Sequence, residues 1–139
     1  MIAAKIILLA AVAQVALTLW STVTLGLARI ACLKTGALTL GDIALDDTRW
    51  PDEIKKLQAN NRSQYETPVL FFAGVAIALA TGSANWGVAV FAVLFIASRI
   101  VHRMIHVGSN RVGKRFKAFV AGLAALAGLW LSLLIDALF

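Results

Sequence analysis

Basic and histidine side chains recur at helical spacing in two neighbouring segments, and these residues have the types and spacing that could do chemistry. The first set falls at positions i, i+3, i+4 and i+7, which is one face of a helix: Arg99, His102, Arg103 and His106. The second set, at i, i+4 and i+8, is Arg111, Arg115 and Phe119. So much positive charge predicts a site for an anionic ligand.

Glu66 is the only acid within the helical segments that border these two sets. We expect it to neutralise one arginine, with Arg99 as the first choice, although its residue type fits a structural ion pair and a ligand-binding role equally. His102 and His106 are spaced for a shared metal or haem, but the sequence offers no third ligand, so we expect no metal. Basic side chains at helix ends also arise from membrane topology alone, because their long stems reach the lipid headgroups.

No established catalytic motif accompanies these residues. The sequence has no Walker loop, no Gly-x-Ser-x-Gly, no His-Glu-x-x-His and no paired acids in a plausible site. The single cysteine, Cys32, is expected to be inert packing. The residues alone therefore predict a basic pocket without defining a reaction.

Composition defines the environment that must hold this pocket. The chain has 139 residues, of which 60% are apolar and 14% charged, and its mean hydropathy is +0.85. Soluble domains are about 45–50% apolar and about 25% charged, and so small a globule could not bury this much apolar surface. Ten glycines, two prolines and one cysteine also exclude disordered, collagen-like and disulfide-rich classes. We expect one small integral membrane domain.

Four apolar stretches, extended into their flanks, approach the roughly 20 helical residues that a membrane crossing needs. We predict an all-α, four-transmembrane-helix bundle over residues 1–139, with spans at about 3–28, 60–82, 85–106 and 116–138. The first run exceeds the apolar core of about 7–15 residues in a signal peptide, so we expect a retained span. The second span, begun at about residue 60, brings Arg62 and Glu66 into the membrane interface.

The distribution of positive charge indicates the orientation. The net charge is +6, with six Lys and Arg residues in each of the first and third connections and none in the second. The positive-inside rule then places both basic connections in the cytoplasm and both termini on the other side. Because the charge reflects topology, we expect the lipid bilayer and not nucleic acid as a partner. The long polar connection over 29–58 is of a length typical of functional or mobile loops.

Two stretches carry a family resemblance: NNRSQYETPVLFFA, residues 60–73, and SRIVHRMIHVGSNRVGKRFKAF, residues 98–119. The first resembles the start of helix two, and the second the helix-three to helix-four signature, of the MAPEG family (membrane-associated proteins in eicosanoid and glutathione metabolism). The resemblance covers the whole architecture. It implies a bacterial-type member in the inner membrane that forms a homotrimer, with glutathione held between adjacent subunits near the cytoplasmic face.

The resemblance also implies roles for individual residues. Arg115 matches the arginine that holds the glutathione thiolate, and is the implied catalytic residue. Glu66 and Arg62 match the helix-two acid and arginine that contact the peptide part of glutathione. The implied glutathione-binding set is Arg29, Arg62, Ser63, Glu66, Arg99, His102, His106, Arg111 and Phe119.

Glutathione suits these residues chemically. Its two carboxylates and one ammonium complement several arginines and one glutamate. Lowering a thiol pKa of about 8.5 by two units requires roughly 2.7 kcal/mol of thiolate stabilisation, an energy that one desolvated guanidinium can supply. A mouth facing the lipid would admit an apolar electrophile for the thiolate to attack. We therefore expect a membrane transferase or peroxidase-like enzyme, with glutathione as co-substrate and a lipophilic small molecule as acceptor.

Three positions depart from the family pattern and keep an alternative open. Ser63 stands where the family usually has asparagine, Ala59 where it has an arginine, and Phe119 where the well-known enzymes have tyrosine. Since each change weakens a thiol site, the chain could instead be a non-catalytic membrane subunit of the same fold that binds a lipid or a partner protein. A transporter is less favoured, because the sequence has no inverted repeats or broken helices.

Overall fold

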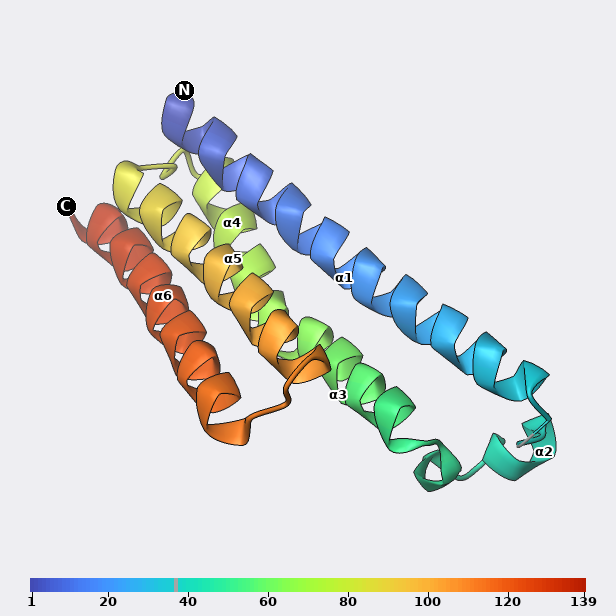
Figure 1. Ribbon diagram of the computed structural model, residues 1–139. Helices are drawn as coiled ribbons and strands as arrows, with labels where there is room; N and C mark the ends of the chain where they lie inside the picture. Colours follow the sequence, from blue (N-terminus) through green and yellow to red (C-terminus); the bar gives the residue numbers. More distant parts are fainter. Residues whose placement is uncertain (37) are drawn as a thin grey trace.

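The protein is a bundle of long helices in a computed structural model that describes residues 1–36 and 38–139. Every element within these residues is helical. In chain order they are α1 (Ile2–Lys34), α2 (Leu40–Ile43), the 3-10 turn η1 (Asp47–Arg49), α3 (Asp52–Glu66), α4 (Pro68–Ala80), α5 (Trp86–Val107) and α6 (Val112–Leu138). Both termini lie at one end of the bundle, and the turn between α5 and α6 lies toward the other (Figure 1).

Three of the described helices are long and apolar enough to cross a membrane: α1, α5 and α6, with 33, 22 and 27 residues. At about 1.5 Å of rise per residue, even α5 is roughly 33 Å long, and the hydrocarbon core of a bilayer is about 30 Å thick. Large apolar side chains along these helices are exposed, including Leu8, Leu19, Val93 and Leu134. Lipid is the natural neighbour of such surfaces.

The helix expected over about 60–82 is divided in two. α3 already begins at Asp52 and ends at Glu66, and α4 begins at Pro68 and has 13 residues. Proline has no backbone N–H and its ring clashes with the preceding helical turn, so the break at Thr67 follows from Pro68. Figure 1 shows α4 continuing from α3 along the bundle. Alone, α4 is shorter than the roughly 20 residues of a membrane span.

The first connection is shorter and more ordered than the sequence indicated. α1 continues to Lys34 and α3 begins at Asp52, so much of the polar stretch expected over 29–58 is helical. Trp50 and Ile54 are buried against Leu25 of α1. This apolar contact holds the connection against the bundle.

A row of buried polar side chains joins α1 to α3. Gln14 Nε2 donates to Gln64 Oε1 at 3.1 Å, and Ser21 Oγ donates to Asn60 Oδ1 at 3.1 Å. All four residues are buried. Because an unpaired amide or hydroxyl is costly in apolar surroundings, these pairs set the position of α3 along α1.

Close helix contacts elsewhere depend on glycine. A Cβ built on Gly122 of α6 would lie 2.7 Å from Ser98 Oγ, and one built on Gly128 would overlap the ring of Phe91. Both neighbours belong to α5, so these glycines let the two helices approach closely. Small residues serve the same purpose in membrane helix pairs generally.

We predict opposite effects for two glycine-to-alanine changes. Gly128→Ala lowers the free energy of unfolding by about 1–3 kcal/mol, because the added methyl group forces α5 and α6 apart. Gly26→Ala in α1 is the matched control, since its Cβ meets nothing within 4 Å. Its higher helix propensity raises stability by up to about 1 kcal/mol. Unfolding titrations in detergent measure both changes; a Gly128→Ala protein as stable as wild type would contradict the packing argument.

Candidate functional site

Two adjoining cavities lie where α3 faces the turn between α5 and α6. They share two residues, His106 from the last turn of α5 and Arg115 from the start of α6. The outer cavity has a volume of about 540 Å³ and the inner one about 280 Å³. His106 is buried and Arg115 is half-buried. These two side chains therefore stand at the junction of the cavities.

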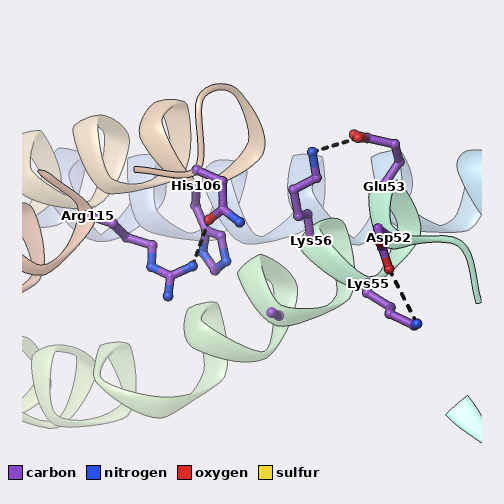
Figure 2. A pocket seen from close by; sticks show the side chains of 8 residues that line it. Asp52, Glu53, Lys55, Lys56, His106 and Arg115 are labelled. Atoms are coloured by element: carbon purple, nitrogen blue, oxygen red, sulfur yellow. Dashed lines mark hydrogen bonds and ion pairs between the residues drawn. The ribbon is translucent and has the colours of Figure 1, made fainter. Parts of the chain in front are cut away.

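The outer cavity is lined mainly by charged groups. Its α3 wall carries two ion pairs, each three residues apart: Lys55 Nζ to Asp52 Oδ1 at 3.4 Å, and Lys56 Nζ to Glu53 Oε1 at 2.7 Å. Figure 2 shows these pairs on one side of the cavity and Arg115 and His106 on the other. Exposed pairs of this kind contribute at most about 1 kcal/mol. A charged ligand can therefore replace them at little cost.

The inner cavity combines an aromatic wall with polar groups. The ring of His102 has its centroid 6.4 Å from that of Phe119 and 5.4 Å from that of His106. The Nδ1 atoms of both histidines are buried without a hydrogen-bond partner, so each ring keeps an unused polar atom. The cavity is lined by Ser63, Glu66, His102, His106, Val112, Arg115, Phe116 and Phe119.

Arg115 carries an uncompensated positive charge at the junction. Its Nη1 donates to Asn110 Oδ1 at 2.8 Å. Within residues 1–36 and 38–139, no ion pair of 4 Å or less includes Arg115 or Glu66. Both therefore present charges to the inner cavity that a ligand can meet. As for metals, the described residues contain no group of three or more His, Cys, Asp or Glu side chains arranged to hold one.

Arg99 and Glu66, the pair that we expected, interact electrostatically but form no ion pair of 4 Å or less. Its Nη2 donates to the Ser63 carbonyl at 2.7 Å and to Ser63 Oγ at 3.0 Å, and its Nη1 reaches Thr67 Oγ1 at 3.5 Å. The last four carbonyls of a helix have no partner within the helix, and the Ser63 carbonyl is the first of these four in α3. Arg99 therefore satisfies backbone that the end of α3 leaves free, and it acts as a cap for α3.

Arg103 is directed toward α1 and contributes to neither cavity. Its Nη1 donates to Asn60 Oδ1 at 2.6 Å, and its guanidinium lies over the ring of Trp20, 4.3 Å from the centroid. Its Nη2 also reaches Thr24 Oγ1 at 3.4 Å. The predicted helical face is thus divided: its histidines line the cavities, and its arginines hold helices together.

Three other predicted site residues also lie outside the two cavities. Arg62 is exposed and lines a third cavity of about 780 Å³. Arg29 lies over Trp50, 5.2 Å from its ring centroid, and donates to Gln58 Oε1 at 3.1 Å. Arg111 is the exposed N-cap residue of α6. Within this chain the inner cavity brings together only part of the predicted set: Ser63, Glu66, His102, His106, Arg115 and Phe119.

Some lining residues were missed by the sequence reasoning. Val112 and Phe116 line the inner cavity with Arg115 and lie on the same face of α6. Their i, i+3 and i+4 spacing could have identified them. Lys55 and Lys56 line the outer cavity, whereas in the sequence they were counted only among the six basic residues of the first connection. No sequence signal distinguished them from other basic residues at a membrane surface.

The fold and site together define a class: a helical integral membrane protein with a basic, partly aromatic cavity at one end of its bundle. The MAPEG family model matches residues 7–135, and the chain belongs to the MAPEG family. Comparison with curated proteins and with solved structures gave no match. Members of this family generally use glutathione. Membership suggests a glutathione-related function in the membrane, of transferase, isomerase or related type.

The capping role of Arg99 predicts a graded loss of stability. Arg99→Met leaves the Ser63 carbonyl and hydroxyl without their donor, and we expect the free energy of unfolding to fall by about 1–3 kcal/mol. Ser63→Ala removes only one acceptor and keeps the carbonyl contact, so its loss is smaller, about 0.5–1.5 kcal/mol. Exposed Lys117→Met serves as the control for removing a cation. Unfolding titrations in detergent give the order; a larger loss in Ser63→Ala than in Arg99→Met would contradict it.

Proposed function

We propose that the protein is a glutathione-dependent membrane transferase or peroxidase-like enzyme that acts on lipophilic electrophiles. The observation that carries this proposal is the position of Arg115 and His106 at the junction of a charged cavity and an aromatic one. A polar tripeptide and an apolar electrophile need opposite surroundings, and the two cavities offer both side by side. The reacting sulfur belongs at the junction, beside the Arg115 guanidinium.

The charges of glutathione have counterparts on the cavity walls. Lys55, Lys56 and Arg115 can meet its two carboxylates and its thiolate, and Glu66 can accept hydrogen bonds from its ammonium or amide groups. An outer cavity of about 540 Å³ lies within the range of pockets for small ligands. Phe116 and Phe119 offer the acceptor an apolar surface.

The proposed reaction begins with loss of the thiol proton to water, favoured by the positive charge of Arg115. In conjugation, the thiolate sulfur attacks an electrophilic carbon, a C–S bond forms, and the leaving group departs with its bonding electrons. In peroxide reduction, the thiolate attacks one peroxide oxygen, and the O–O bond breaks to give a sulfenic acid and, after protonation, an alcohol. A second glutathione then reduces the sulfenic acid, giving a disulfide and water.

The proposed assembly is a homotrimer of four-span subunits in a bacterial inner membrane. α3 and α4 together form the second crossing, and both termini are on the non-cytoplasmic side. The common end of the termini in Figure 1 supports this orientation, as does the placement of the basic connections at the other end. Arg29 and Arg62 lie away from the Arg115 cavities of their own chain, so in the trimer they serve the glutathione of a neighbouring subunit.

One observation favours the alternative of a non-catalytic subunit that binds a lipid or a partner protein. The Ser63 hydroxyl donates to the Asn60 carbonyl at 2.8 Å and accepts from Arg99, so its hydrogen-bonding capacity is largely used within the chain. Phe119 has no hydroxyl either. A thiolate in the inner cavity would therefore depend on Arg115 and the histidines alone.

Glutathione binding tests the proposed function. We expect the detergent-purified protein to bind glutathione with millimolar affinity or better by calorimetry. Arg115→Ala and Glu66→Gln each weaken binding about 10- to 100-fold, the equivalent of one lost hydrogen bond to a charged group. Lys117→Ala, an exposed change two residues from Arg115, leaves affinity unchanged.

Conjugating activity toward an apolar aryl halide provides the second measurement. Arg115→Ala should reduce kcat as well as affinity, because the thiolate is stabilised less. Unchanged activity in Arg115→Ala would show that another group activates the thiol. The wild-type protein could instead fail to bind glutathione and co-purify with a lipid or protein in stoichiometric amount. That result would contradict the proposed enzyme and support the non-catalytic alternative.

A further inference from the structure

Asn110 has a backbone conformation that few residues other than glycine adopt. Its φ is +47°, and among the described residues it is the only non-glycine with a positive φ. Asparagine tolerates this left-handed conformation better than most residues, because its short polar side chain can bond locally. Its N–H donates to the Ile105 carbonyl at 2.7 Å. The backbone of Asn110 is thus fixed against the end of α5.

The side chain of Asn110 is directed from this fixed backbone to Arg115. Its Oδ1 accepts from Arg115 Nη1 at 2.8 Å, and the residue lines the outer cavity. An arginine side chain loses about 2 kcal/mol of rotamer entropy when it is fixed, so a placed acceptor changes how often the guanidinium occupies one position. The acceptor is a neutral amide oxygen. Unlike a carboxylate, it restrains the guanidinium without cancelling its charge.

We infer that Asn110 is a positioning residue whose amide oxygen holds the Arg115 guanidinium at the junction of the two cavities. The inference rests on the proposed glutathione site, where the remaining N–H donors and the full charge of Arg115 are left for the thiolate. The position requires a residue that accepts a left-handed backbone, carries an acceptor and is uncharged. Glycine accepts the left-handed backbone and is uncharged, but it has no acceptor. Aspartate accepts the backbone and has an acceptor, but it is charged.

Asn110→Gly is the primary test, because it keeps the turn and removes only the acceptor. We expect the Kd for glutathione to rise about tenfold, as for loss of one hydrogen bond to a charged group. We also expect the pKa of the bound thiol to rise by about one unit, measured from the ultraviolet absorbance of the thiolate against pH. Ser109→Gly, an exposed change in the same turn, is the matched control for added flexibility.

Two further measurements separate positioning from a structural role. In an Arg115→Ala background, where ligand-detected NMR measures weak affinities, Asn110→Gly should cause no further loss. Asn110→Asp should keep Arg115 in place but neutralise it, so glutathione binding weakens although the side chain stays ordered. The inference would be overturned if Asn110→Gly lowered the affinity for glutathione equally with and without Arg115. It would also be overturned if the Asn110→Asp protein bound glutathione as tightly as wild type.

A ligand-independent measurement distinguishes this inference from the proposed function. In protein labelled with ¹⁵N-arginine, the Arg115 Nη–H signal, identified by its loss in Arg115→Ala, reports the hydrogen bond from Nη1 to Asn110 directly. Asn110→Gly should speed its exchange with solvent about tenfold, whereas Asn110→Asp and Ser109→Gly should not. Wild-type protein that fails to bind glutathione would defeat the proposed function, and this signal would still decide the role of Asn110. An unchanged exchange rate in Asn110→Gly would overturn it.

Discussion

α3 is a polar helix within a largely apolar bundle, and the hydrogen bonds that it shares with α1 and α5 hold it there. From α5, Arg99 donates to the Ser63 carbonyl and Arg103 donates to the Asn60 side chain. From α1, the Gln14 side chain donates to the Gln64 side chain. Without these donors, the Ser63 carbonyl and the side-chain oxygens of Asn60 and Gln64 would lose hydrogen bonds among apolar side chains, at about 1–3 kcal/mol for each group left unpaired. The position of the α3 wall of both cavities depends on these contacts.

This arrangement gives the basic face of α5 two separate uses. Its arginines contact α3 and α1, because long side chains with several donors can reach a backbone carbonyl or an aromatic ring there. Its histidines are shorter, and they remain at the cavity beside Phe119 and Glu66. The one arginine left at the junction comes from another helix, α6. Of the arginines, only Arg115 therefore offers its charge to a ligand at the junction, and Lys55 and Lys56 add positive charge on the α3 wall of the outer cavity.

The sequence predicted correctly those features that depend on the residues of a single helix, such as its location and the side chains that share one face. Long apolar runs located α1, α5 and α6, and helical spacing brought His102, His106, Arg115 and Phe119 to one cavity. It did not foresee the direct partners of Arg99: Glu66 acts on the guanidinium only at a distance, and the hydrogen bonds go to Ser63 at the end of α3. The stacking of Arg29 on Trp50 could not be foreseen, since it depends on how the first connection folds back on α1. Contacts between elements distant in the chain, and not periodicity, decide such positions.

The place of Arg115 at the end of the bundle lets it remain charged. An arginine at the bilayer centre costs about 2.5–3.5 kcal/mol and less near the interface, so a site at the end of the bundle can stay charged. Phe116, which is exposed, and Phe119, which is half-buried, line the inner cavity with Arg115, and apolar neighbours of this kind reduce the screening of a charge. Arg115 is also the fourth residue of α6, whose N-terminus has no side-chain cap; the helix dipole there disfavours the arginine's own positive charge but favours an anion beside it by about 0.3–1 kcal/mol. In the proposed reaction, a two-unit fall in thiol pKa requires roughly 2.7 kcal/mol, and the guanidinium would have to supply the larger part of it and the helix the smaller.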